Sequence, residues 1–328
     1  MISDKTKPLW QSGFYVALAS MIFTALFKVM DNITVHNFIK APDTIILVSA
    51  YLIIGAWIGF FSSLPFALFF GKRLVDPAFE KISFGNSKTQ IAAVITGFIS
   101  AIATFFNLWA NCIIDPGAVI SLSSAVILFT LAYDLVKKQV NFRIIILPLF
   151  FVLFGGMMAA YNGSFRITLM GILLMGVVSN GLTAASEIIE QNGTRASDGV
   201  NFFIWRFLWL AIFGTIMTVT MANLRGCGGM LVDTIISSLP YFAWFVLTML
   251  FVFLGIGLKL TAKKVGIVSV VLMVLSGQVV LGYIFTLSGN SLIPGLFGDV
   301  SAEPSVWIVR AIGAVFLIAG IFQLRKKF

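Results

Sequence analysis

The chain has 328 residues, of which 59% are apolar and only 11% are charged, and its mean hydropathy is +1.02. A soluble domain carries about 25% charged residues and could not bury this much apolar surface, so the composition excludes soluble globular, disordered and fibrous proteins. The net charge of +9 comes from short loops between apolar runs rather than from one basic patch, which argues against a nucleic-acid partner.

The apolar runs predict ten membrane-spanning helices, since a helix needs about 20 residues to cross the hydrocarbon. The polar start of the chain and the long apolar run after it indicate a retained first span rather than a cleaved signal peptide. In chain order we expect helices at residues 11–30, 44–70, 89–111, 116–136, 143–161, 166–187, 199–222, 232–259, 263–287 and 304–324.

Lysine and arginine fall mostly in alternate loops, which sets the orientation. The bias predicts a multi-pass protein of the cell (inner) membrane, embedded in the lipid bilayer, with both termini in the cytoplasm. Ten spans with both ends on one side divide into two sets of five, and an odd number per half inverts the second half. We therefore expect an all-α membrane fold of two inverted five-helix repeats, residues 1–162 and 163–328.

Several segments resemble a known transporter family. Residues 171–180 are similar to the start of that family's second repeat, residues 116–138 to its helix 4, residues 259–275 to its tight turn between helices 8 and 9, and residues 311–327 to its closing helix. On these segments the chain resembles the drug/metabolite transporter superfamily, specifically its EamA-like ten-helix members.

The resemblance implies a central cavity lined by helices 1, 3, 4, 6, 8 and 9, with helices 5 and 10 at the periphery and transport by alternating access. The chain departs from the family in helix 9, which lacks the proline and the terminal glutamate often found there. Gln278 and Ser288 stand in that stretch, which leaves a helix break and an acidic role in doubt.

Polar residues within the predicted spans are candidates for substrate contact, because a polar group in hydrocarbon needs a partner or a cavity. Each has a structural interpretation as well: helix packing, a hydrogen bond between helices, or anchoring at the interface. Aromatic rings around one amide would suit an organic metabolite with an apolar or cationic part, such as an amino acid or an amine. The candidates are Asn107, Ser124, Asn180, Trp244, Gln278 and Tyr283.

Charged residues in the spans suggest proton or ion coupling. Lys28 and Asp31 are three residues apart on one helical face and can form a cavity-lining pair or an interfacial one. Glu187 lies near the cytoplasmic end of its helix, where it can carry a proton or form a structural pair with Arg206. Both interpretations remain open for each group.

The sequence lacks the constellations that an enzyme would need. A single histidine leaves no zinc cluster and no serine–histidine pair, and no glycine-rich phosphate loop is present, so we expect no enzyme activity, metal or cofactor. The predicted function is a secondary active transporter, an exporter or exchanger of a small organic metabolite, acting as a monomer or homodimer. The alternative is a non-transporting membrane scaffold or receptor-like subunit.

Overall fold

The structure is a computed structural model, and it describes residues 13–113, 123, 125–159, 161, 172–293, 296 and 303–324. Every regular element in these ranges is a helix, and no strand occurs within them. Seven helices of the described part are long and apolar enough to cross a membrane. The expected all-α, multi-pass membrane architecture is confirmed at this level.

The helices follow the predicted apolar runs in chain order. The first half contains α1 (Gly13–Ile33), η2 (Thr34–Phe38), α2 (Thr44–Phe66), η3 (Ala67–Val75), α3 (Ser87–Ile113), α5 (Val126–Val136) and α6 (Phe142–Ala159). The second half contains η4 (Ile172–Ser179), α8 (Asn180–Arg195), α9 (Gly199–Leu224), α10 (Gly228–Ser238), η5 (Leu239–Tyr241), α11 (Phe242–Val265), α12 (Val268–Leu275), α13 (Gln278–Leu292) and α14 (Pro304–Leu324).

Two predicted helices are interrupted. The helix expected at 232–259 is composed of α10, η5 and α11, and Pro240 lies in the short η5 turn between the two α-helices, where its missing N–H costs least. The helix expected at 263–287 begins at Val268 and is broken at Gly277, which separates α12 from α13. Gly277 packs so closely against α1 that a Cβ there would overlap Met21.

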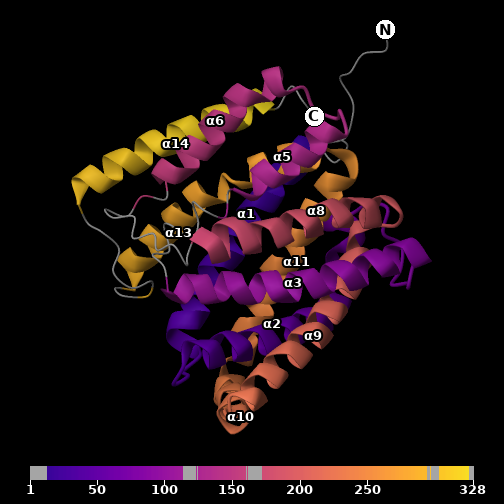
Figure 1. The fold of residues 1–328 in the computed structure, drawn as a ribbon, viewed down its shortest axis with the longest axis vertical. Helices are drawn as coiled ribbons and strands as arrows, with labels where there is room; N and C mark the ends of the chain where they lie inside the picture. The colour runs from indigo at the N-terminus through magenta and orange to yellow at the C-terminus, as the bar shows by residue number, and fades with distance from the viewer. Residues whose placement is uncertain are drawn as a thin grey trace.

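The helices form an elongated bundle (Figure 1). The pair α6 and α14 lies along one edge, and α2, α9 and α10 lie toward the opposite edge, with α1, α3, α8 and α11 between them. α1 packs against α11, and α8 packs against α3. α1 also contacts α12 and α13, while α8 contacts α5, and α2 pairs with α9 as α6 does with α14. The α1–α11 and α3–α8 contacts thus each join a helix of the first half to a helix of the second half, and this pattern occurs twice.

The recurrence extends to single hydrogen bonds. Ser20 of α1 donates its hydroxyl to the carbonyl oxygen of Gly255 in α11, at 2.7 Å. Ser179, at the junction of η4 and α8, donates in the same way to the carbonyl oxygen of Ala103 in α3, at 3.4 Å. The two serines are the same type of donor at the same place in two equivalent helix pairs.

Close packing between α2 and α9 is also reciprocal. A Cβ on Gly59 would lie 2.6 Å from the Phe207 ring, and one on Gly214 would lie 3.3 Å from the Leu52 side chain. Leu52 precedes Gly59 by the same seven positions that separate Phe207 from Gly214. Each helix thus places a glycine opposite the other's bulky residue.

The α6–α14 contact is built on small residues at its centre. A Cβ on Gly155 would meet the backbone of Leu317 at 2.5 Å and the carbonyl oxygen of Gly313 at 2.7 Å, and one on Gly313 would meet the carbonyl oxygen of Gly155 at 2.7 Å. The two backbones touch here, as small residues allow in lipid.

Loops predicted to share a side of the membrane do lie together. At one end of the bundle, Asp76 accepts a hydrogen bond from the backbone N–H of Gly199 at 2.8 Å and approaches the Lys264 ammonium at 3.3 Å. At the other end, Arg225 forms an ion pair with Asp43 at 2.8 Å. We call these the Asp76 end and the Asp43 end.

Candidate functional site

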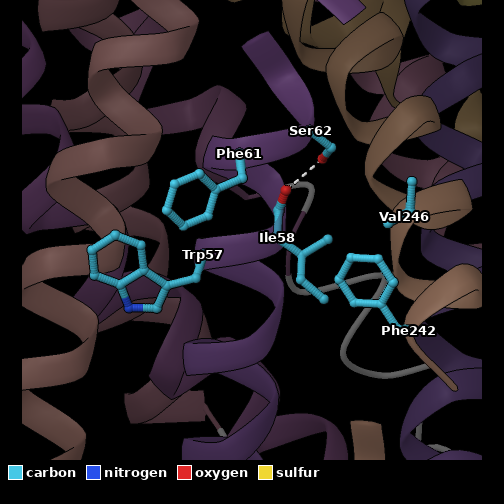
Figure 2. A pocket seen from close by; sticks show the side chains of 6 residues that line it. All are labelled: Trp57, Ile58, Phe61, Ser62, Phe242 and Val246. Atoms are coloured by element: carbon cyan, nitrogen blue, oxygen red, sulfur yellow. Dashed lines mark hydrogen bonds between the residues drawn. The ribbon is translucent and has the colours of Figure 1, made fainter. Parts of the chain in front are cut away.

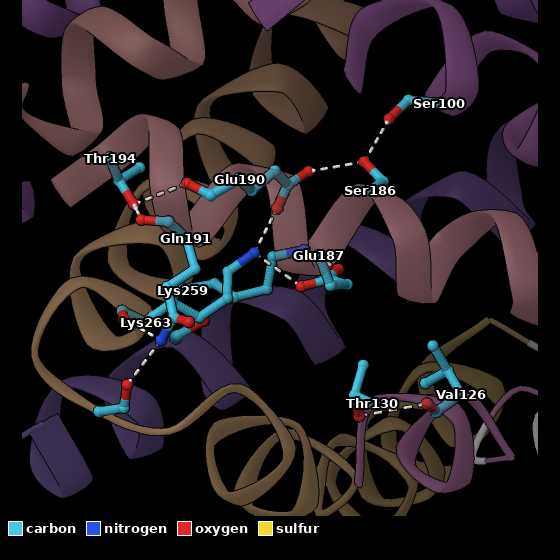
Figure 3. A network of polar contacts seen from close by, with 12 residues as sticks. Ser100, Val126, Thr130, Ser186, Glu187, Glu190, Gln191, Thr194, Lys259 and Lys263 are labelled. Atoms are coloured by element: carbon cyan, nitrogen blue, oxygen red, sulfur yellow. Dashed lines mark hydrogen bonds and ion pairs between the residues drawn. The ribbon is translucent and has the colours of Figure 1, made fainter. Parts of the chain in front are cut away.

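The charged residues inside the bundle gather between α8 and α11 near the Asp76 end. Glu187 accepts from Lys259 at 2.8 Å and from Lys263 at 2.7 Å, and Glu190 contacts the same Lys263 ammonium (Figure 3). The side chains of Glu190 and Lys263 are fully buried, and those of Glu187 and Lys259 are 6% and 15% exposed. We call these four residues, with Arg206, the inner cluster.

Helix geometry explains why these groups meet. Glu187 and Glu190 are three residues apart on α8, and Lys259 and Lys263 are four apart on α11, so each pair lies on one face of its helix. Gln191 then joins the two helices by donating to the carbonyl oxygens of Lys263 and Gly266, at 3.0 and 2.9 Å. Those carbonyls lie at the end of α11, where the helix itself supplies no donors.

The sequence predicted a pair between Arg206 of α9 and Glu187. The structure pairs Arg206 with Glu190 instead. Its Nε lies 3.0 Å from the Glu190 carboxylate, and its Nη2 donates to Ser100 of α3 at 2.8 Å. Ser186 donates to Glu190 at 3.1 Å and lies 3.3 Å from Ser100. The acid that pairs with Arg206 is therefore one helical turn further along α8 than predicted.

A second polar group lies toward the Asp43 end. The Tyr51 hydroxyl of α2 donates to the Asp31 carboxylate of α1 in a short hydrogen bond. Lys28, one turn before Asp31, is exposed, and within the described residues its ammonium makes no hydrogen bond or ion pair. The charges acting on it are Lys259 of the inner cluster and Asp31. We call Lys28, Asp31 and Tyr51 the outer group.

Lys28 and Lys259 connect the outer group with the inner cluster electrostatically. Side chains of a helix lean toward its N-terminus, and α1 and α11 run antiparallel, so Lys28 and Lys259 lean toward each other across the middle. The inner cluster and outer group together contain four cations (Lys28, Arg206, Lys259, Lys263) and three carboxylates (Asp31, Glu187, Glu190), which leaves one positive charge. The predicted site and pairing residues did not include four members of these groups: Tyr51, Glu190, Lys259 and Lys263. They also did not include Ser100, which contacts Arg206.

The predicted substrate-contact residues are spread over several environments. Asn180 is buried at the start of α8, and Asn107 is half-buried on α3. The Trp244 indole donates to Thr34 at 2.8 Å, and its ring packs edge-on against Phe38. This packing explains Trp244 without a cationic ligand.

Gln278 is half-buried at the first position of α13, directly after the break at Gly277. Its side-chain carbonyl oxygen is buried and has no hydrogen-bond partner among the described residues. Ser124 lies outside the described residues, and so does the side chain of Tyr283.

One pocket of about 390 Å³ lies between α2 and α11 (Figure 2). It is lined by Trp57, Ile58, Phe61, Ser62, Phe242 and Val246. Phe61 and Phe242 are both more than half exposed, so the pocket lies on the flank of the bundle. None of the predicted substrate-contact residues lines it, and its apolar walls suit a lipid chain better than a polar metabolite.

Within the described ranges, no three His, Cys, Asp or Glu side chains come close enough to hold a metal ion. No protein-family model matches the chain, and no curated protein matches it. The resemblance to drug/metabolite transporters therefore rests on the sequence segments alone.

Proposed function

We propose that the chain is a secondary active transporter that moves a small organic metabolite by alternating access between two inverted five-helix repeats, residues 1–162 and 163–328. The proposal follows the resemblance to the EamA-like drug/metabolite transporters. Inverted repeats give a membrane protein two equivalent ends, each of which can open while the other is closed.

A constant register between the halves supports the repeats. Ser20 and Ser179 are 159 positions apart, and the same offset superimposes Thr24 and Ala25 of α1 on the identical residues Thr183 and Ala184 of α8. The reciprocal glycines of α2 and α9 fix an offset of 155 for that pair. The hydrogen bonds and the glycine contacts thus give one sequence alignment for α1 with α8 and one for α2 with α9.

The polar residues of the two groups correspond to one another under these same offsets, and this correspondence is the main support for the proposal. The α1–α8 offset places Asp31 on Glu190, and the α2–α9 offset places Tyr51 on Arg206. Asp31 contacts Tyr51, and Glu190 contacts Arg206, so the contact itself is repeated. Because the repeats are inverted, one copy lies toward each end of the bundle, which is where a pair of alternating gates belongs.

The two gates are in different states. In the inner cluster, both carboxylates and Lys263 are buried and ion-paired, whereas Lys28 in the outer group is exposed. On this proposal, the carrier is closed at the Asp76 end and open toward the Asp43 end. Basic residues in the loops favour the cytoplasm for the Asp76 end.

Flux into proteoliposomes tests the proposal. The purified chain would be reconstituted and offered labelled amino acids, amines, monocarboxylates, nucleosides and sugar phosphates, with protein-free liposomes and Glu190→Gln as controls. Saturable uptake of one class, lost in the variant, supports a carrier. Ligand binding without flux for every class would contradict transport and favour a receptor-like subunit.

A further inference from the structure

Lys28 differs from the three cations of the inner cluster. Lys259, Lys263 and Arg206 each contact a carboxylate, whereas Lys28 has no hydrogen bond or ion pair among the described residues. An ammonium in the hydrophobic span needs water, a carboxylate or a ligand. Because its side chain is exposed, Lys28 is accessible to one.

The proposed repeat register shows how the surroundings of Lys28 differ from those of its counterpart. Its counterpart in α8 is Glu187, which contacts Lys259 of α11. The serine contacts match Ala103 with Gly255, an offset of 152 between α3 and α11, so the counterpart of Lys259 is Asn107. In this register a glutamate and a lysine, Glu187 and Lys259, correspond to a lysine and a neutral amide, Lys28 and Asn107.

The net charge of the inner cluster and outer group indicates the charge that a ligand should carry. The inner cluster and outer group carry one excess positive charge, so a ligand with a single negative charge neutralises them. A dianion would leave a negative excess, and a cation would be repelled by Lys28 and by Lys259, which already acts on it. An ammonium is a strong donor to a carboxylate.

We propose that the outer group binds the carboxylate of a small organic monoanion, with Lys28 as its charged contact. This rests on the proposed transport function and names its substrate class. The amine-like substrate suggested by the aromatic residues is replaced by an anionic one.

Matched probes test the charge requirement directly. Thermal shifts of the purified full chain would be measured with lactate, hexanoate and phenylacetate, with the amide of each, and with succinate and phenethylamine. At least one monocarboxylate should stabilise the protein in a saturable way, while its amide, the dianion and the amine should not. Absence of any monocarboxylate response, or an equal response to the amide, would overturn the proposal.

Variants connect the effect to Lys28. Lys28→Met should weaken binding of the stabilising carboxylate about tenfold or more, as expected for a lost charge-assisted hydrogen bond, and Lys28→Arg should restore most of it. Lys88→Met, at an exposed lysine on the first turn of α3, should bind normally. Unchanged binding by a folded Lys28→Met protein would refute the assignment.

Flux separates this inference from the function on which it rests. Uptake of a neutral or cationic compound, unaffected by Lys28→Met, would leave the transporter intact and remove the carboxylate site. Carboxylate binding that depends on Lys28, without flux of any compound, would keep the site and remove the transporter.

Discussion

Removing Glu190 should destabilise the protein far more than removing an acid from an exposed ion pair. The Glu190 side chain is fully buried and contacts both Lys263 and Arg206. Glu190→Gln keeps the shape but leaves Arg206 without a carboxylate and puts a second excess positive charge among these groups. Breaking a buried pair in this way costs about 3–5 kcal/mol.

Asp43→Asn is the matched control. Asp43 and Arg225 are 2.8 Å apart, but their side chains are 35% and 42% exposed, so their pairing contributes about 0–1 kcal/mol. Asn also retains the N-cap of α2, where Asp43 accepts from the backbone of Ile45. The two variants thus remove the same charge from different degrees of burial.

Thermal unfolding in detergent, with an SDS titration in mixed micelles for free energies, measures both variants. At about 2–4 °C per kcal/mol, Glu190→Gln should lower Tm by about 6 °C or more, and Asp43→Asn by less than about 4 °C. Glu190→Gln with Arg206→Gln should recover much of the loss, because both buried charges are gone. Equal losses in the two single variants, or strict additivity in the double variant, would refute the reasoning.

Three further predictions address packing and topology. Gly155→Leu should disrupt the α6–α14 contact, because its Cβ meets backbone atoms, and should lower the free energy of unfolding in the SDS titration by at least about 1–3 kcal/mol. Gly181→Ala, which has open space around it, should not destabilise the protein. Asp134→Ala should cost about 1 kcal/mol by removing the acceptor for the N–H of Ser269 on α12, at 3.0 Å, and Asp134→Asn should retain most of that stability. Single cysteines would be placed at the exposed Lys88 and Lys40 in a Cys112→Ser, Cys227→Ser background. They should react with a membrane-impermeant maleimide from opposite sides of sealed vesicles. Reaction of both from the same side would overturn the topology.

The sequence predicted the helices well because crossing a bilayer imposes length and hydropathy directly on the chain. It could not predict where a helix breaks: Pro240 and Gly277 act through local backbone chemistry and close packing that composition does not reveal. The departure from the family pattern in helix 9 left that break in doubt, and the break occurs at Gly277.

The site was harder to predict, because pairing between helices depends on rotation and depth. Glu187 and Glu190 share a face of α8, so the sequence could not decide which of them meets Arg206. In the sequence, Lys259 and Lys263 look like the basic residues that flank a membrane span on its cytoplasmic side. In the structure, the Lys263 side chain is completely buried. The pattern common to α1 and α8, Ser and Thr-Ala followed by an acid and an amide, was the available signal.

Alternating exposure of the two gates is the most direct test of the account. Phe27 and Ser186 are counterparts in α1 and α8, and each can carry a single cysteine in the cysteine-free background. Lys259→Met weakens the inner cluster while Glu187 keeps Lys263. We predict that it speeds modification of Cys at position 186 from the Asp76 side and slows modification at position 27 from the Asp43 side. Rates that change in the same direction, or remain unchanged at both positions, would contradict alternating access.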